Sequence, residues 1–173
     1  MVEIIEQDFV KNKELYKKIE RELRKKIDKD IPIDHVGSTA IPDMIGKNII
    51  DVLVGAKDQV QFQELAKILC EMGYFPSKNS RNEIYQFFAS REEETGSGDV
   101  HIHLVMLNTD RYNEFLILRN YLLNNKDEAL AYANCKREII KNITAERKEY
   151  RSIKSEYVTK LLERAKKSFN NKN

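Results

Sequence analysis

All three histidines of the chain fall in two short stretches that also carry other polar groups. His35 stands just before a Val-Gly-Ser segment, and His101 and His103 belong to the run DVHIHLVM. If that run is a strand, its i and i+2 side chains point to the same face, roughly 6.5–7 Å apart. Two imidazoles so placed could chelate a metal, bind a phosphate, or act as a base beside another group. The competing interpretation is that one histidine packs in the core and the other is solvated at a sheet edge.

Asp51 interrupts an apolar, β-branched run, IIDVLV, at residues 49–54. A nearly continuous apolar run of this length is typical of a strand that is covered on both faces. An ionised carboxylate is costly there unless a metal ion, a basic side chain or a wet cleft compensates it. Each of these compensations makes Asp51 a candidate for chemistry, and we expect it to share a site with His101 and His103.

A Gly-Ser turn precedes this run and could bind an anion. Gly37 would let the backbone approach a phosphate closely, and the Ser38 hydroxyl would add a donor. Thr39 and Lys47 lie in the same loop and could also contact a phosphate. The alternative interpretations are that Gly37-Ser38 is an ordinary turn and that Lys47 is a solvated loop lysine. The role of His35 stays open between a general base and a residue that shapes the turn.

The elements that would position these residues alternate between helices and strands. We expect an amphipathic helix capped by Asp8 and reaching about residue 27, strands near residues 31–36 and 49–54, a helix from Asp58 to Gly73, β segments at 74–75 and 84–89, a hairpin loop between Ala89 and Asp99, and a strand at 99–106. From Arg111 onward the apolar spacing is helical, in three helices. The sequence thus predicts an α+β fold, a small mixed β-sheet flanked by helices, with a helical C-terminal part.

The composition is that of a globular, highly charged protein, with 34% charged and 41% hydrophobic residues. No apolar run approaches the ~20 residues that cross a bilayer, so we expect no membrane partner. Two cysteines without CxxC spacing, Cys70 and Cys135, predict reduced thiols in a cytoplasmic protein. Residues 136–173 carry twelve Lys/Arg against five Asp/Glu. This basic excess could favour an anionic partner, but solvated helix faces are the preferred interpretation. Nucleic acid is not favoured, because glutamates dilute this charge and no recognised binding motif is present.

Two segments, HVGSTAIP and IGKNIIDVLV, together resemble the signature of the GrpB family, whose fold is similar to that of the nucleotidyltransferase superfamily. The DVHIHLV strand resembles the family's histidine-rich strand. The segment LRNYLLNNKDEALAYANCKRE resembles the family's helical segment, including Arg119, Tyr121, Tyr132 and Lys136, and the segment around Lys154 resembles its last helix. The resemblance implies one GrpB-like nucleotidyltransferase-fold domain over residues 1–173, with the sheet and its helices at about 1–108 and the helical part at about 109–170.

The resemblance also implies a chemistry. Nucleotidyltransferases carry Gly-Ser, then D-x-D, then a third carboxylate, and the carboxylates hold two divalent cations. Gly37-Ser38 resembles the first part and Asp51 the second Asp of D-x-D. Ile49 stands at the first Asp, and the strand with His101 and His103 takes the place of the third carboxylate.

The resemblance therefore implies a metal-dependent nucleotidyltransferase-like enzyme acting on a nucleotide or another phosphorylated small molecule. Its catalytic and metal-binding residues would be Asp51, His101 and His103, with Mg, Mn or Zn as the divalent ion. Its nucleotide would be held by Gly37, Ser38, Thr39 and Lys47. The alternative is a nucleotide-binding or regulatory module that kept the fold and lost transfer chemistry, and Ile49 is the feature that favours it. Neither the substrate nor the oligomeric state follows from the sequence.

Overall fold

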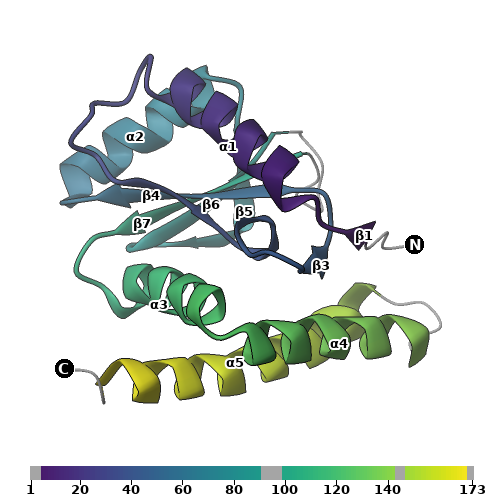
Figure 1. Cartoon of the computed structure of the whole chain (residues 1–173). Helices are drawn as coiled ribbons and strands as arrows, with labels where there is room; N and C mark the ends of the chain where they lie inside the picture. The colour runs from purple at the N-terminus through teal and green to yellow at the C-terminus, as the bar shows by residue number, and fades with distance from the viewer. Residues whose placement is uncertain (1–4, 91–98, 143–146, 171–173) are drawn as a thin grey trace.

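The computed structural model describes residues 5–90, 99–142 and 147–170, which form two helical layers around a mixed sheet (Figure 1). The elements in chain order are β1 (Ile5–Glu6), α1 (Phe9–Leu23), β2 (Ile33–Val36), the 3-10 turn η1 (Ser38–Ala40), β3 (Ile45–Gly46), β4 (Ile50–Ala56), α2 (Gln59–Glu71), β5 (Phe75–Asn82), β6 (Tyr85–Ala89), β7 (Val100–Met106), α3 (Asp110–Asn124), α4 (Lys126–Asn142) and α5 (Arg147–Asn170). Of the hairpin loop expected between Ala89 and Asp99, residues 91–98 lie outside the described residues.

The sheet has five strands in the order β2-β4-β7-β6-β5. The neighbours β4 and β7 run parallel, and the other neighbouring strands are antiparallel. A short antiparallel pair, β1 with β3, lies apart from this sheet. The mixed sheet expected from the sequence is therefore confirmed, and the strand that carries Asp51 lies beside the strand that carries the two histidines.

The helices α1 and α2 cover one face of the sheet (Figure 1). Both begin at the expected N-caps, because Asp8 accepts a hydrogen bond from the Lys11 amide and Asp58 accepts one from the Gln61 amide. Their apolar stripes pack on the side chains of the central strands, in a core that includes Leu23, Leu65, Leu69, Val52, Val54, Ile102 and Leu104. This burial of the apolar stripes is what holds the two helices on the sheet.

The helices α3, α4 and α5 lie on the opposite face (Figure 1). Tyr112 of α3 packs with Leu53 and Val105, which point away from the α1–α2 core because alternate strand residues face opposite sides. A further cluster joins the C-terminal helices to the loop after η1, and its buried members are Ile41, Met44, Ile45, Leu122, Ala129, Tyr132, Ala133 and Leu161. The C-terminal helices are thus anchored to the loop that follows the Gly-Ser turn.

The short pair β1–β3 was not expected from the sequence, and the bounds of two other elements differ from the expectation. The strand β5 continues to Asn82, although only residues 74–75 were expected as β structure. It is an edge strand that is mostly exposed, so its polar sequence FPSKNSRN lacks the apolar alternation by which strands are recognised. The helix α1 ends at Leu23 rather than near residue 27, and Ile27 is buried from the turn that follows.

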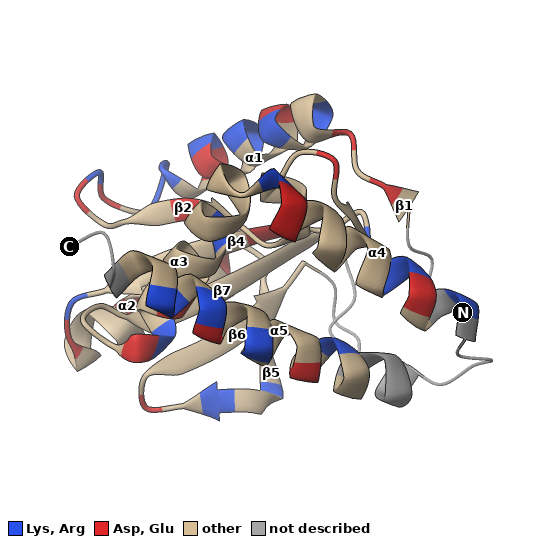
Figure 2. Ribbon diagram, turned by 60° about the horizontal axis from the view of Figure 1, so that its bottom comes forward, with Lys and Arg blue, Asp and Glu red and all other residues tan. Residues whose placement is uncertain are grey.

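Acidic and basic residues alternate along α1 and α5 (Figure 2). Such a mixture is typical of helix faces in contact with water. Within the described ranges, no helix is both long and apolar enough to cross a membrane.

Candidate functional site

Asp51, His101 and His103 meet on one face of the sheet. Asp51 is the register partner of His101 across the parallel β4–β7 pair, and His103 lies two residues further along β7. The Asp51 Oδ1 atom lies 3.3 Å from His101 Nδ1 and 3.4 Å from His103 Nε2. These three side chains are 25%, 18% and 14% exposed, respectively. The strand alternation expected from the sequence therefore brings the predicted residues into contact.

The charge of Asp51 is fixed by these contacts. Burial alone would raise the pKa of Asp51, but hydrogen bonds from His101 and His103 and their charge outweigh burial and hold this pKa well below its usual value. Asp51 is consequently ionised at neutral pH and acts only as a hydrogen-bond acceptor.

A tyrosine holds one of the histidines from the other side. The Tyr85 hydroxyl lies 3.0 Å from His103 Nδ1, and burial raises the pKa of this phenol. Since an ionised Asp51 can only accept, His103 carries a proton on Nε2. Tyr85 donates to Nδ1 when His103 is neutral and accepts from Nδ1 when His103 is charged. Tyr85, His103 and Asp51 thus form a hydrogen-bonded chain that starts on β6, passes through the central strand β7 and ends on β4.

The Gly-Ser turn closes over the carboxylate. Gly37 has a φ of +74°, and a Cβ at this position would overlap Asp51 Oδ2, so only glycine fits without movement. Ser38 follows at the start of η1 and faces the same cavity as Asp51. The two residues expected to hold a phosphate therefore lie directly beside the carboxylate.

Thr39 and Lys47 lie elsewhere. Thr39 is fully buried, and its hydroxyl lies 3.0 Å from His35 Nε2 and 3.4 Å from the Ile49 carbonyl. Lys47 follows β3 and is not among the residues that line the cavity. His35 stacks on Tyr16 with a ring-centroid distance of 4.6 Å, and burial lowers its pKa to about 4. His35 is held by this stacking and by Thr39, and it is not among the residues that line the cavity, which favours the turn-shaping role over that of a general base.

Asp51 and the two histidines line a cavity of about 460 Å³ between the sheet and the C-terminal helices. The opposite wall carries apolar side chains of α3 and α5, among them Phe115, Leu118 and Val158. It also carries the cationic side chains of Arg119 and Lys154. The cavity therefore combines an anionic floor, a Gly-Ser turn and a partly basic wall.

Arg119 is held in place by the strand that leads into the turn. Its Nη1 donates to Asp34 Oδ1 at 2.9 Å and to the His35 carbonyl at 3.1 Å. This charge-assisted pairing fixes α3 against β2.

Lys136 of α4 lies behind the turn and is only 1% exposed. Its Nζ lies 2.7 Å from Ser38 Oγ, 2.8 Å from the Ile45 carbonyl and 4.2 Å from the centre of the Tyr132 ring. Burial lowers the pKa of Lys136 to about 7. Residue periodicity alone gave no sign of this contact across 98 residues, and only the family resemblance had singled out Arg119, Tyr132, Lys136 and Lys154.

The donor types of the cluster suit a divalent metal, but their arrangement does not form a metal site. In the part of the chain that the structure describes, no group of three or more His, Cys, Asp or Glu side chains could hold a metal ion. Both imidazoles instead face the same oxygen of Asp51 at hydrogen-bond range.

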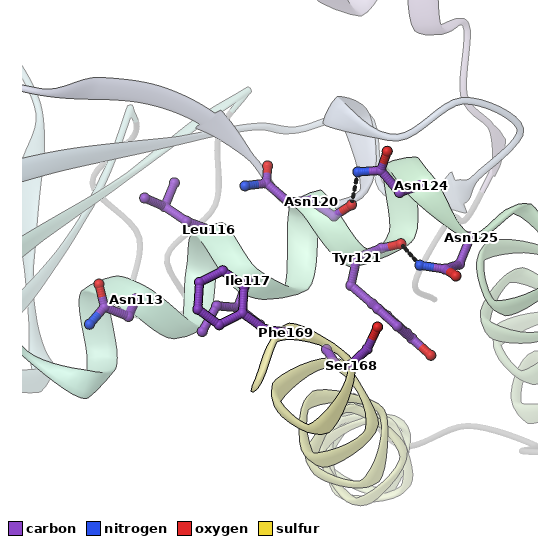
Figure 3. Close-up of a pocket in the computed structure, with 10 residues that line it drawn as sticks. Asn113, Leu116, Ile117, Asn120, Tyr121, Asn124, Asn125, Ser168 and Phe169 are labelled. Atoms are coloured by element: carbon purple, nitrogen blue, oxygen red, sulfur yellow. Dashed lines mark hydrogen bonds between the residues drawn. The ribbon is translucent and has the colours of Figure 1, made fainter. Parts of the chain in front are cut away.

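A second cavity, of about 560 Å³, lies between α3 and α5 (Figure 3). Asn124 and Asn125 in its wall direct their side-chain amides to the backbone carbonyls of Asn120 and Tyr121. Its lining contains no Asp, Glu, His, Lys, Arg or Cys. Of these two cavities, the Asp51 cavity is thus the one lined by Asp, His, Lys and Arg side chains.

Sequence comparisons point to one family. A family model described as GrpB protein matches residues 2–164. A UPF0157 protein of Pseudomonas aeruginosa is 34% identical over 135 residues, which are 77% of this chain and 54% of that protein. The glutamate-rich protein GrpB of Alkalihalophilus pseudofirmus is 29% identical over 134 residues, which are 75% of this chain and 76% of that protein. The match thus spans about half the length of the Pseudomonas relative.

Solved structures show the same fold. The conserved protein GrpB from Enterococcus faecalis superposes with a TM-score of 0.79 and 22% identity, over 96% of this chain and 99% of that chain. The Cid1 poly(U) polymerase with MgGTP bound gives a TM-score of 0.52 and 14% identity, over 79% of this chain and 45% of that chain. The nucleotidyltransferase-like α+β fold expected from the sequence is confirmed. Because the family model extends over most of the chain, the chain belongs to the GrpB family.

Proposed function

We propose that the cavity above Asp51 binds a nucleotide or another phosphorylated small molecule, and that the protein is a nucleotidyltransferase-like enzyme. One observation carries the proposal: the Asp51–His101–His103 cluster shares a cavity with the cationic side chains of Arg119 and Lys154. A phosphorylated ligand needs cations and hydrogen-bond donors, and a transfer reaction needs a group that takes up a proton. The nucleotidyltransferase-like fold agrees with this class of ligand.

The proposed roles follow the geometry. Gly37 and Ser38 would lie against a phosphate, and Arg119 and Lys154 would counter its charge. Thr39 and Lys47, which lie outside the cavity lining, would support the loop rather than touch the ligand.

Ionised Asp51 stabilises a positive charge on a neighbouring imidazole, so that His101 could take the proton of an acceptor hydroxyl. His103 would position Asp51, because its two ring nitrogens already meet Asp51 and Tyr85. The proposal treats the whole chain as one domain, because residues on both sides of position 108 line the cavity. It also keeps the cytoplasmic location expected from the sequence.

A divalent ion, Mg, Mn or Zn, belongs to the proposal as a cofactor to be tested. When bound, it would neutralise phosphate charge. Asp51, His101 and His103 are the residues that would have to rearrange to hold it, since the described residues form no ready metal group.

A second candidate function is a ligand-binding or regulatory module without transfer chemistry. Ile49, half-buried just before β4, occupies the place of the first carboxylate of the superfamily motif. The missing carboxylate favours binding without turnover.

Ligand titration tests the proposal. Nucleoside triphosphates and inorganic phosphate, each with and without Mg, Mn or Zn, are titrated while the melting temperature is recorded. A ligand at one hundred times its Kd stabilises the folded state by about 2.7 kcal/mol, and for a protein of this size we expect a rise in melting temperature of about 5–10 °C. Arg119→Met should remove most of this rise. The matched control is Arg137→Met, which changes a surface arginine that pairs with Glu6 at 3.5 Å.

Failure of every phosphorylated ligand to shift the wild type would overturn the proposed ligand class. An equal shift in Arg119→Met would overturn the role of the basic wall. Chromatography of the nucleotide after incubation with hydroxyl acceptors distinguishes the enzyme from the binding module, because it detects conversion of the nucleotide. Turnover that is lost in Asp51→Asn supports the enzyme, whereas binding without turnover under every ion supports the binding module.

A further inference from the structure

The contact between Ser38 and Lys136 has a geometry that phosphate binding alone does not need. The hydroxyl of Ser38 faces the cavity, while the ammonium group of Lys136 approaches it from the protein interior at 2.7 Å. Lys136 is 1% exposed, so solvent reaches the serine but not the lysine. The lack of a side chain at Gly46 leaves room for Ser38 in this position, because a Cβ at residue 46 would lie 3.0 Å from Ser38 Cβ and 3.1 Å from Ser38 Oγ.

Lys136 is buried without a carboxylate partner among its described contacts. Its Nζ meets the Ser38 hydroxyl, the Ile45 carbonyl and the face of the Tyr132 ring. In the charged form, three N–H groups can be directed at these three neighbours. In the neutral form, two N–H groups can be directed at the carbonyl and the ring, and the lone pair then accepts the Ser38 proton. Both protonation states are therefore satisfied in the same geometry.

The charged and titratable side chains that affect Lys136 come from its own helix, α4, and from α5 and β4. Burial is the main cause that lowers the pKa of Lys136, and the charge of Lys154 on α5 lowers it further. Asp51 on β4 and Cys135 on α4 act in the opposite direction. The result is a pKa of about 7, so that a substantial fraction of Lys136 is a free amine at neutral pH.

We propose that Ser38 and Lys136 form a nucleophile–base pair, in which Ser38 Oγ accepts a phosphoryl group covalently. A hydroxyl beside an amine that is shielded from solvent is the arrangement by which serine is activated in Ser-Lys enzymes. The inference deepens the proposed function, since it assigns a covalent acceptor to the same cavity and rests on the phosphorylated class of ligand proposed for it.

The step balances without a further reagent. Ser38 Oγ attacks phosphorus, the new O–P bond forms, and the serine proton passes to Lys136 Nζ. The bond from phosphorus to the leaving oxygen breaks, and that oxygen departs into the cavity with the bonding electrons, as a phosphate anion or as an alcohol that takes its proton from water, while Lys136 keeps the serine proton. The products are a phosphorylated Ser38, a free alcohol or phosphate, and a protonated Lys136 that can return the proton to Ser38 Oγ in the reverse transfer.

An alkyl fluorophosphonate is the probe for this pair, because it reacts with activated serine and needs no metal. The Ser38 O–P bond forms, the P–F bond breaks, fluoride leaves, and Lys136 keeps the serine proton. We expect intact-mass and peptide mass spectrometry to find one label, on Ser38, in the full-length wild type. Ser38→Ala should lose the label, whereas Ser77→Ala, a serine of the edge strand β5, should keep it.

The decisive variant is Lys136→Met, which removes the proposed base. Lys136→Met should slow labelling of Ser38 by about 100-fold or more, the usual contribution of a general base. Lys141→Met is the matched control, because Lys141 lies further along α4 with a 70% exposed side chain paired to Glu138. The labelling rate of the wild type should rise with pH and level off above pH 7, and this profile should be absent in Lys136→Met. The profile keeps the test decisive even if Lys136→Met perturbs the turn, because a purely structural lysine would not produce it.

Absent labelling, labelling at another residue, a wild-type rate in Lys136→Met, or a wild-type rate that does not change with pH would each overturn the inference. These results are separate from those of the ligand titration. Nucleotide binding without labelling overturns only the nucleophile–base pair. Labelling of Ser38 in a protein that binds no phosphorylated ligand overturns the proposed function instead.

Discussion

Replacing Lys136 by methionine should change how the stability of the protein depends on pH. Methionine matches the length of the lysine stem and keeps the apolar contacts, but it removes the titratable amine. It also leaves Ser38 Oγ and the Ile45 carbonyl without their common donor. The net change in stability at one pH mixes these terms, whereas the pH dependence isolates the amine.

The sign follows from proton counting. Burial lowers the pKa of Lys136 from the ordinary 10.5 to about 7, so between these values the unfolded chain binds more protons than the folded one. The free energy of unfolding of the wild type therefore rises with pH in this window. Each pH unit adds up to about 1.4 kcal/mol. From pH 7, where the amine is half protonated, to pH 9, the wild type should gain about 2 kcal/mol relative to Lys136→Met.

Urea unfolding at several pH values, followed by circular dichroism, measures this difference. The slope of free energy against urea should be equal in the two proteins, so that the change reports the folded state. Lys141→Met should follow the wild-type pH profile, because its amine is exposed. Parallel profiles for wild type and Lys136→Met would refute the lowered pKa and, with it, the supply of free amine near neutral pH.

Two further substitutions test the geometry around Asp51. Gly37→Ala should destabilise the protein by about 3 kcal/mol in urea unfolding, because its φ is positive and the new Cβ would overlap Asp51 Oδ2. Gly73→Ala is the control and should cost only about 1 kcal/mol, because Gly73 also has a positive φ, +87°, but has nothing within 4 Å of an added Cβ. Equal losses of stability in the two variants would contradict the close approach of Gly37 to Asp51. Tyr85→Phe should shift the imidazole Nδ1 signal of His103 in ¹H–¹⁵N spectra and leave its Nε2 signal in place, and an unchanged Nδ1 signal would show that the hydroxyl does not bond to this ring.

The strand residues of the site could be predicted because the side-chain period of a strand is two. That period placed His101 and His103 on one face, and the lone carboxylate in IIDVLV marked Asp51 as a residue in need of a partner. Their contact depends on β4 and β7 being parallel neighbours in register. Register is a property of the whole sheet, which local patterns do not encode.

The remaining half of the site could not be predicted from local pattern. Lys136 is followed by two charged residues, Arg137 and Glu138, and the same residue type is exposed further along the helix at Lys141. What buries Lys136 is the docking of α4 on β3, between residues 91 positions apart. Thr39 and Lys47 were placed in the ligand site because they share a loop with Ser38, but a loop can direct neighbouring side chains to opposite sides.

The wall formed by α3 and α5 also sets an order of events during synthesis. All strands of the sheet precede residue 107, whereas Lys154 and Val158 of the wall come about fifty residues later. At ribosomal rates of 5–20 residues per second, the sheet is complete about 3–10 s before these residues are made. A nascent chain at that stage has Asp51 and both histidines without the basic wall above them. Ligand capture by this cavity is therefore deferred until the C-terminal helices have been made and packed, so an interrupted chain would carry the floor of the site without the ability to use it.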